Sequence, residues 1–295
     1  MKTSALLLAL LAVALSPLLQ AQEDEAASRR KAQTLADGLN YQKGEITLKS
    51  GLAKIVVPDN FRYLDAKDAE TVLTKIWGNP KGSGTLGMLV PANVSPAADE
   101  SWAVIITYDE DGYVKDDEAA KMDYNKILKE MKEGTAEANK ARQKEGYPGI
   151  ELVGWATTPR YDAATHKMYW AKELKFDGSS ENTLNYNIRM LGRRGVLVLN
   201  AVAVMSQIQQ IEAATPAVLA MVDFQEGHRY TDFNASTDKV AAYGLAALVA
   251  GGIAGKVGLF KGLLVGLLAA KKFVIVGVIV AFAFLKKLFG KKETA

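Results

Sequence analysis

The sequence predicts an α+β protein, an antiparallel sheet with packed helices, followed by C-terminal transmembrane helices. Three observations predict this class. Short apolar or alternating runs are separated by turn residues, as in hairpin-connected strands. Amphipathic helical stretches stand between and after them without regular strand–helix alternation. The last 56 residues of the 295-residue chain are apolar and basic. With 49% hydrophobic and 23% charged residues, the chain has the composition of a folded protein.

The first 21 residues predict a secretory signal peptide. Lys2 precedes an apolar run over residues 5–15, and the small residue Ala21 precedes the acidic Glu23. Leu19 is not the small residue that a cleavage site prefers, so an uncleaved anchor is the alternative. Either interpretation exports the following domain, which we place at residues 22–239.

The first half of this domain predicts a helix, a hairpin, a second helix and two strands. Residues 23–39 are charged with few apolar positions, and residues 46–57 alternate around a Ser-Gly turn. Apolar residues then recur at helical spacing over residues 69–76, after Asp65 or Asp68 as the N-terminal cap. Strands are expected at residues 86–90 and 102–108.

The second half predicts a long helix, four strands and a final helix. The amphipathic helix runs from about Asp117 to Lys144, with acids in its first turn and basic residues in its last. The expected strands are 151–157, 167–176, 183–191 and 195–205, joined by turns at 158–159, 178–179 and 193–194, and the last helix covers 207–224. Strands joined by hairpins form an antiparallel sheet.

Residues 240–285 contain no acid and only four lysines, which predicts a membrane segment. Two spans, about 240–260 and 262–285, fit best, because 24 residues of helix are about 36 Å long and the hydrocarbon core is about 30 Å thick. A single span remains the alternative, since Lys271 and Lys272 would each cost about 2.5–3.5 kcal/mol at the bilayer centre. A basic tail, 286–295, follows.

Small residues recur every three or four positions in this segment, which places them on one helical face. Such a face packs helices closely, either between two chains or between the two arms of one hairpin. The residues are Ala247, Gly251, Gly255, Gly258, Gly262 and Gly266.

Charge and composition limit the partners. Residues 22–239 carry 27 basic and 32 acidic side chains, whereas the last 56 residues carry eight lysines and one acid. An acidic domain is not expected to bind nucleic acid, and a basic tail favours anionic membrane lipid. The absence of cysteine from the sequence excludes disulfides, thiolate metal sites and a cysteine nucleophile.

One group of residues is a candidate for acid/base chemistry or anion binding. Asp162, His166, Arg193 and Arg194 lie near neighbouring turns of the predicted sheet. The alternative is that they form turns and solvated strand ends. Two histidines on separate elements do not predict a zinc hydrolase, and we expect no cofactor.

Residues 107–118 contain part of a calcium-loop pattern. Asp109, Asp111 and Glu118 stand at positions 3, 5 and 12 of an EF-hand loop, but position 1 is Thr107 and the preceding element is a strand. The alternative is a turn at Gly112 and an acidic helix start. Residues 82–87 spell G-x-G-x-x-G between a helix and a strand, the reverse of a dinucleotide loop, which favours a connector.

Several segments together resemble a known family. They include W-G-N-P at 77–80, D-G-Y-V-K-D-D-E at 111–118, G-W-A-T-T-P-R-Y-D at 154–162, L-N-Y-N-I-R-M-L-G-R-R-G-V-L at 184–197 and G-H-R-Y-T-D-F-N-A-S-T-D-K-V-A-A-Y-G at 227–244. The chain is similar to bacterial membrane-anchored proteins that share a domain of unknown function. The resemblance implies an exported domain with a C-terminal anchor, and it assigns no activity or catalytic residue.

The sequence therefore favours a non-enzymatic binding or scaffold module on the extracytoplasmic side of a bacterial cell membrane. Its expected partners are membrane lipid and either a second copy or another envelope protein. Two alternatives stay open: an envelope hydrolase that uses Asp162, His166 and Arg193, and a calcium-binding module at residues 107–118.

Overall fold

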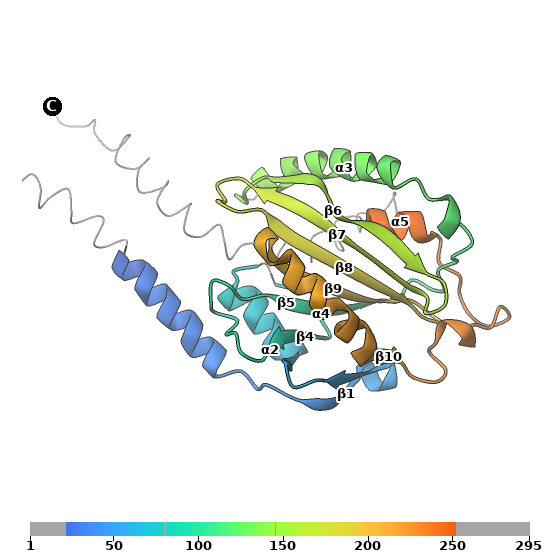
Figure 1. Ribbon diagram of the computed structural model, residues 1–295, viewed down its shortest axis with the longest axis horizontal. Helices are drawn as coiled ribbons and strands as arrows, with labels where there is room; N and C mark the ends of the chain where they lie inside the picture. Colours follow the sequence, from blue (N-terminus) through green and yellow to red (C-terminus); the bar gives the residue numbers. More distant parts are fainter. Residues whose placement is uncertain (1–21, 80, 145, 252–295) are drawn as a thin grey trace, which may run out of the picture.

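The computed structural model describes residues 22–79, 81–144 and 146–251, and it confirms an α+β fold with antiparallel sheets and packed helices (Figure 1). A seven-stranded main sheet has the order β3-β4-β5-β9-β8-β7-β6. Its neighbouring strands all pair antiparallel. The strands are β3 Phe61–Asp65, β4 Gly87–Pro91, β5 Ala103–Asp109, β6 Ile150–Asp162, β7 Lys167–Phe176, β8 Thr183–Leu191 and β9 Val196–Val204.

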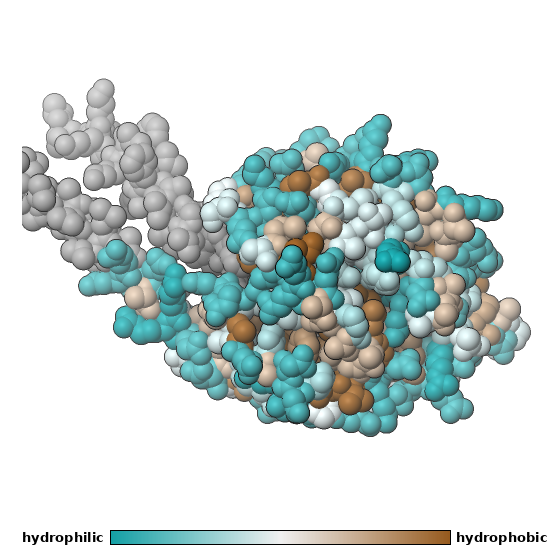
Figure 2. Space-filling model, viewed as in Figure 1, coloured by the Kyte–Doolittle hydropathy of each residue, from teal (hydrophilic) through white to brown (hydrophobic). Residues whose placement is uncertain are grey.

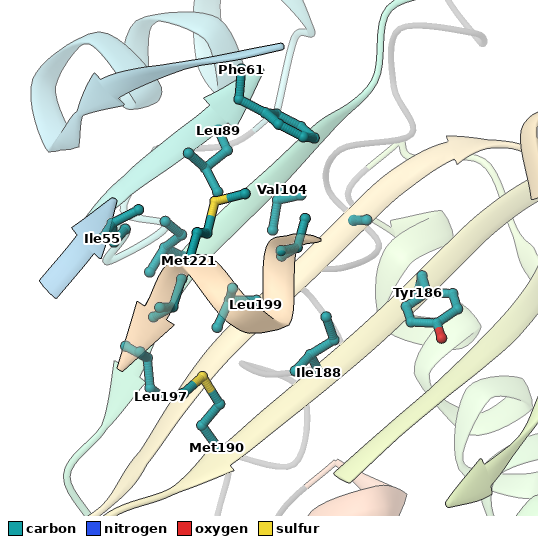
Figure 3. Packing of buried hydrophobic residues seen from close by; sticks show 14 of the residues in the cluster. Ile55, Phe61, Leu89, Val104, Tyr186, Ile188, Met190, Leu197, Leu199 and Met221 are labelled. Carbon is teal, nitrogen blue, oxygen red and sulfur yellow. The ribbon is translucent and has the colours of Figure 1, made fainter. Parts of the chain in front are cut away.

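A small sheet and one helix cover the first face of the main sheet. The small sheet has the order β1-β2-β10, and the helix is α4, Ile208–Met221. Figure 1 shows α4 crossing this face, and Figure 3 shows the apolar side chains packed beneath it. The strands of the small sheet are β1 Gly44–Leu48, β2 Ala53–Val57 and β10 Val222–Phe224.

The second face is covered by helices at both ends. The helices α3, Tyr124–Lys144, and α5, Leu245–Ala250, pack over β6 and β7, with Met131 and Trp170 in the shared cluster. The helix α2, Ala66–Thr71, and the π-helical turn Val72–Ile76 pack over β3, β4 and β5. Because neighbouring residues of a strand point to opposite faces, burial on both faces explains why every residue of β8 is buried.

The outer surface is mainly polar. Figure 2 shows hydrophobic residues on the α4 face only in small patches between hydrophilic ones. Among the described residues, Val56 and Val240 are the large hydrophobic residues that are exposed, at 57% and 40%. The apolar residues of the folded domain are therefore largely used in its own core.

Most predicted elements are present. The residues 22–37 are helical, the hairpin at 44–57 forms β1 and β2, and the strands at 183–191 and 167–176 have the predicted bounds. Asp65 caps α2 because its carboxylate accepts a hydrogen bond from the Asp68 amide at 2.9 Å. These features depend on local patterns, which the sequence carries directly.

The predicted turn at 158–159 is wrong. Strand β6 continues through it to Asp162, with register shifts against β7 between Leu152 and Gly154 and again before Arg160. Proline has no backbone N–H to donate, and an edge strand such as β6 tolerates this because it has a partner on one side only. Bulges in β6 accommodate the residues that do not pair with β7. The chain turns instead at residues 163–166.

Two predicted helices have different bounds. The helix expected from Asp117 begins at Tyr124, where Asp123 accepts hydrogen bonds from the amides of Asn125 and Lys126 at 3.0 Å. The helix expected over 207–224 ends at Met221, because residues 222–224 pair with β2 as β10. Strand β3 lies in a segment for which no strand was predicted.

Residues 240–251, predicted as the start of the membrane segment, lie on the folded domain. The Ala241 amide donates a hydrogen bond of 2.8 Å to the Tyr113 carbonyl, and Leu245 is fully buried in the α3 cluster. Helix α5 ends at Gly251, whose φ is 106°. Within residues 22–251, leaving out 80 and 145, none of the helices has the length and hydropathy needed to cross a membrane. The rest of the predicted segment and the signal peptide lie outside the described residues.

Candidate functional site

The turn between β6 and β7 positions the first site residue, His166. Asp162 closes this turn by accepting hydrogen bonds from the Ala164 amide at 2.9 Å and the Thr165 hydroxyl at 2.7 Å. His166 ends the turn with a φ of 51°, in the left-handed region that few non-glycine residues adopt. The Asp162 carboxylate is thus occupied within its own turn.

The imidazole of His166 is held by residues from three other segments. Its ring lies on the ring of Tyr230, with 4.2 Å between centroids. Its Nδ1 is 3.2 Å from the Tyr161 hydroxyl and 3.6 Å from the Asp116 carboxylate. Three-quarters of the His166 side chain is covered. These contacts fix one face and one nitrogen of the ring.

Asp116 is the charged centre of this group. It accepts hydrogen bonds from the hydroxyls of Tyr161 at 2.5 Å and Tyr230 at 3.1 Å. Burial opposes ionisation of Asp116, but these hydrogen bonds and His166 outweigh it and lower the pKa of Asp116 below its usual value. Burial and the adjacent carboxylate raise the pKa values of Tyr161 and Tyr230. Near neutral pH the carboxylate is therefore charged and both phenols are neutral.

Stacked aromatic rings hold the remote segments together. The ring of Tyr113 lies between Tyr230, at a centroid distance of 4.3 Å, and Phe233, at 3.9 Å. Tyr230 also donates its hydroxyl to the Val114 carbonyl at 3.0 Å. Residues 113–116 and 230–233 are thereby fixed against the β6–β7 turn.

A pocket of about 260 Å³ opens beside His166. We call it the His166 pocket. Its polar lining includes Thr165, His166, Lys167, Asp223, Arg229 and Thr231, and Met190, Leu191, Phe224 and Tyr230 supply apolar surface. Lys167 donates to the Leu219 carbonyl at 2.8 Å. The pocket thus combines two cations, one carboxylate, an imidazole and aromatic surface.

The structure does not bring Arg193 and Arg194 to His166. Arg193 contacts the Asp238 carboxylate at 2.6 and 3.1 Å, and Arg194 contacts it at 3.4 Å. The Asp238 side chain is almost fully covered, and its hydrogen bond from Arg193 lowers its pKa strongly. These two arginines tie the segment before α5 to the β8–β9 turn.

The residues of the calcium-loop pattern have separate protein partners. Asp111 accepts the Tyr243 hydroxyl at 2.9 Å, and Glu118 accepts the Ala246 amide at 2.9 Å at the start of α5. Burial raises the pKa of Asp109. In the part of the chain that the structure describes, no three or more His, Asp and Glu side chains are grouped to hold a metal ion.

The two other sequence features have clear positions. In the glycine-rich segment, the Gly82 amide and the Ser83 hydroxyl both bind the Glu70 carboxylate, at 2.9 and 2.5 Å, and the chain then enters β4. Of the small-residue face, Ala247 lies in α5 and Gly251 ends it. Gly255, Gly258, Gly262 and Gly266 lie outside the described residues.

A row of buried polar side chains crosses the second face of the main sheet. Asn185, Asn187 and Arg189 alternate along β8, and β-pairing places Lys172 opposite Asn185 and Asn200 opposite Asn187. All five are at least 94% buried. Burial and Arg189 lower the pKa of Lys172 to about 7, and no ion pair of Lys172 occurs among the described residues.

Sequence reasoning missed Asp116, Tyr161 and Tyr230 at the pocket and the buried row on β8. Asp116 was interpreted as part of an acidic helix start, and the two tyrosines are distant from it in sequence. The alternating N-Y-N-I-R of residues 185–189 was a visible signal, because a polar residue at every second position marks one face of a strand.

An antiparallel sheet with helices on both faces and a small pocket of mixed charge at one end defines an α+β domain. The chain belongs to the family described as a protein of unknown function, DUF2167, which it matches over residues 40–282. This confirms the resemblance to a family of unknown function. No curated protein matches the sequence.

Three solved structures are similar in part. Cyanobacterial PsbP (CyanoP) from Synechocystis is 12% identical, with a TM-score of 0.35 over 63% of this chain and 93% of that one. LpqN of Mycobacterium tuberculosis, described as involved in cell envelope biogenesis, is 13% identical, with a TM-score of 0.32 over 66% and 96%. The Ran-binding protein Mog1p of Saccharomyces cerevisiae is 11% identical, with a TM-score of 0.33 over 67% and 100%. Similarity at this level does not assign a function.

Proposed function

We propose that this protein is a non-enzymatic binding module of the bacterial cell envelope. Its exported domain is held at the membrane by the apolar segment that follows Gly251, and the His166 pocket receives a ligand or partner there. The single observation that carries the binding role is the hydrogen bonding of Asp116 by Tyr161 and Tyr230 beside the pocket.

This hydrogen bonding favours binding over catalysis. A general acid or base works best when its pKa lies near the operating pH. The pKa of Asp116 is lowered and those of Tyr161 and Tyr230 are raised, so all three are moved away from neutral pH. The group therefore supports a rigid pocket wall, in which His166 is oriented and Asp116 stays charged.

The membrane tether is supported by composition. Residues 252–285 contain no acid and four lysines, and they follow directly after the last described residue of the domain. The basic residues of the tail are suited to anionic lipid headgroups. A second copy of the chain or another envelope protein is the further partner, through the small residues Gly255, Gly258, Gly262 and Gly266 of the apolar segment.

One observation favours a second candidate, an envelope hydrolase. His166 lines the pocket with its Nδ1 3.6 Å from Asp116, the kind of pair that orients a general base. The sequence also offers Asp162 and Arg193 for this chemistry. Those residues are bonded to the β6–β7 turn and to Asp238, so the pair would act without them.

A His166→Gln variant separates the two candidates. Glutamine keeps hydrogen-bonding atoms but cannot transfer a proton as imidazole does. The variant is expressed from a plasmid in a deletion strain of the source bacterium, with His228→Gln as the matched control, and protein level is measured in both. A binding module predicts that both variants restore the wild-type phenotype. Loss of rescue by His166→Gln alone, at normal protein level and with ligand binding by the purified variant retained, assigns the pocket to catalysis.

A further inference from the structure

Arg229 lines the His166 pocket, and its guanidinium has no protein partner among the described residues. Its backbone is fixed, because its amide donates to the Asp232 carboxylate at 2.9 Å and it pairs with Gly192. Within the described part of the chain its side chain has no hydrogen bond, ion pair or ring contact, although it lines the pocket. Five N–H donors in a planar fork are therefore available to a bound group.

Lys167 adds a second cation on the same wall. Its ammonium group uses one donor on the Leu219 carbonyl and is half-buried, and no carboxylate among the described residues lies within ion-pair distance. The one acid in the lining, Asp223, accepts a hydrogen bond from the Phe224 amide at 2.9 Å. The lining residues thus include two cations and one carboxylate, and the charged Asp116 lies behind His166.

The contacts of His166 leave Nε2 as the ring nitrogen without a protein partner among the described residues. Ionised Asp116 only accepts hydrogen bonds, so Tyr161 directs its single proton to Asp116 at 2.5 Å. The Tyr161 oxygen can then only accept from His166, which places the imidazole proton on Nδ1. In the neutral ring Nε2 carries a lone pair, and the described residues supply it with no donor.

The volume limits the ligand. Pockets for drug-sized ligands measure about 300–1,000 Å³, and the His166 pocket measures about 260 Å³. Phe224, Met190 and the Tyr230 ring line its apolar part. A small molecule with one compact acidic group fits this volume.

We propose that the His166 pocket binds a small anion whose carboxylate or phosphate group is held by Arg229 and Lys167 and whose hydroxyl or amino group donates a hydrogen bond to Nε2 of His166. This inference rests on the proposed binding function and names its ligand class. Charge-assisted bonds from a bidentate arginine supply the affinity, and His166 selects anions that carry a donor.

The test uses the full chain in non-ionic detergent at constant ionic strength. Isothermal titration calorimetry is performed with inorganic phosphate, glycolate and acetate, and with glycerol as the neutral control. We expect saturable binding of the anions, tighter binding of glycolate than of acetate, and none of glycerol. Arg229→Ala should weaken anion binding on the order of tenfold or more. Arg160→Ala removes an exposed arginine outside the pocket and should leave binding unchanged.

The role of His166 is measured by the ratio of glycolate to acetate affinity. His166→Asn keeps a residue that tolerates positive φ and should bring this ratio to one. Absence of saturable binding, or equal losses in Arg229→Ala and Arg160→Ala, overturns the proposal. A ratio of one already in the wild type overturns the assignment of Nε2.

The source of the anion is distinguished by adding phosphatidylglycerol to the micelles. Competition with phosphate that depends on Arg229 identifies a lipid headgroup, and its absence identifies a free solute, both within the proposed class. Membrane association is measured on the same variants. Failure of anion binding with intact membrane association overturns this inference alone, and loss of membrane association overturns the proposed tether.

Discussion

The hydroxyl of Tyr161, at the end of β6, donates a hydrogen bond of 2.5 Å to the carboxylate of Asp116, which lies 45 residues earlier in a loop. This bond joins the end of β6 to residues 113–116, where the Tyr113 ring stacks on the Tyr230 ring. It also determines the proton position on His166. The integrity of the pocket therefore depends on a pair of residues that no local pattern connects.

Removal of this hydrogen bond should destabilise the domain. Tyr161→Phe leaves Asp116 with one tyrosine donor, and we expect a loss of about 1–2 kcal/mol in the free energy of unfolding, because a hydrogen bond to a charged, partly buried group is lost. The measurement is urea unfolding followed by tryptophan fluorescence. Tyr169→Phe is the matched control, since no hydrogen bond of its hydroxyl occurs within residues 22–251, and a loss of similar size there contradicts the assignment.

The ion pair between Arg193 and Asp238 predicts a loss of stability in acid. The pKa of Asp238 is lowered in the folded state by its hydrogen bond from Arg193, so the folded state binds fewer protons than the unfolded state. Its contribution is fully present above the ordinary value of 3.8 and is lost as the pH falls below it. Thermal unfolding midpoints between pH 6 and pH 3 should fall less steeply in Asp238→Asn. An unchanged slope in this variant rules out the pair as the acid-sensitive contact.

The buried Lys172 predicts a pH dependence of the same sign, but between neutral and alkaline pH. Its pKa is lowered from 10.5 to about 7 by burial and by Arg189, so between these values the unfolded state binds more protons and stability rises with pH. Arg189 is the charged side chain that lowers the pKa of Lys172, and Asp109 is the carboxylate that acts on Arg189. Lys172→Met should remove the rise and stabilise the protein at pH 7 by about 1–4 kcal/mol.

Lys175→Met is the control for this change, because Lys175 lies exposed on the same strand. Denaturant unfolding at pH 7 and pH 9.5 should show no alteration of the pH dependence in this variant. A Lys172→Met protein that is less stable at pH 7 than the wild type contradicts the view that the amine is an unpaired buried cation.

Helix α5 should contribute to the stability of the domain. Leu245 is fully buried between α5 and the α3 cluster, so Leu245→Ala creates a cavity and should cost about 2–5 kcal/mol. Val240→Ala, at a side chain that is 40% exposed, should cost under about 0.5 kcal/mol. The stability of both variants is measured by differential scanning calorimetry. If Leu245→Ala and Val240→Ala lose equal stability, residues 240–250 do not pack on the domain as described.

The sequence carries the local part of the fold. Alternation along residues 183–191 and 167–176 predicts two central strands with their bounds, and Asp65 predicts the start of α2, because both signals act within a few residues. The course of β6 through Pro159 was not predictable in this way. A proline marks a turn or an edge strand equally well, and the choice depends on the partner strand.

The candidate site was predictable only in part. His166 was recognised by residue type, and it does line a pocket. Asp116 and Tyr230 are separated by 114 residues, and their contact is set by packing of the aromatic rings rather than by spacing. The arginines at 193 and 194 were selected for their charge, and the structure uses that charge on Asp238, a residue of the link before α5.

The tether is tested most directly by the location of the full chain in intact cells. Spheroplasts are treated with protease, and membranes are then washed with alkaline carbonate. The account predicts that the domain is digested from outside and that the remaining C-terminal part stays with the membrane pellet. A chain that is protected from protease in intact spheroplasts, or that carbonate releases into the supernatant, contradicts it.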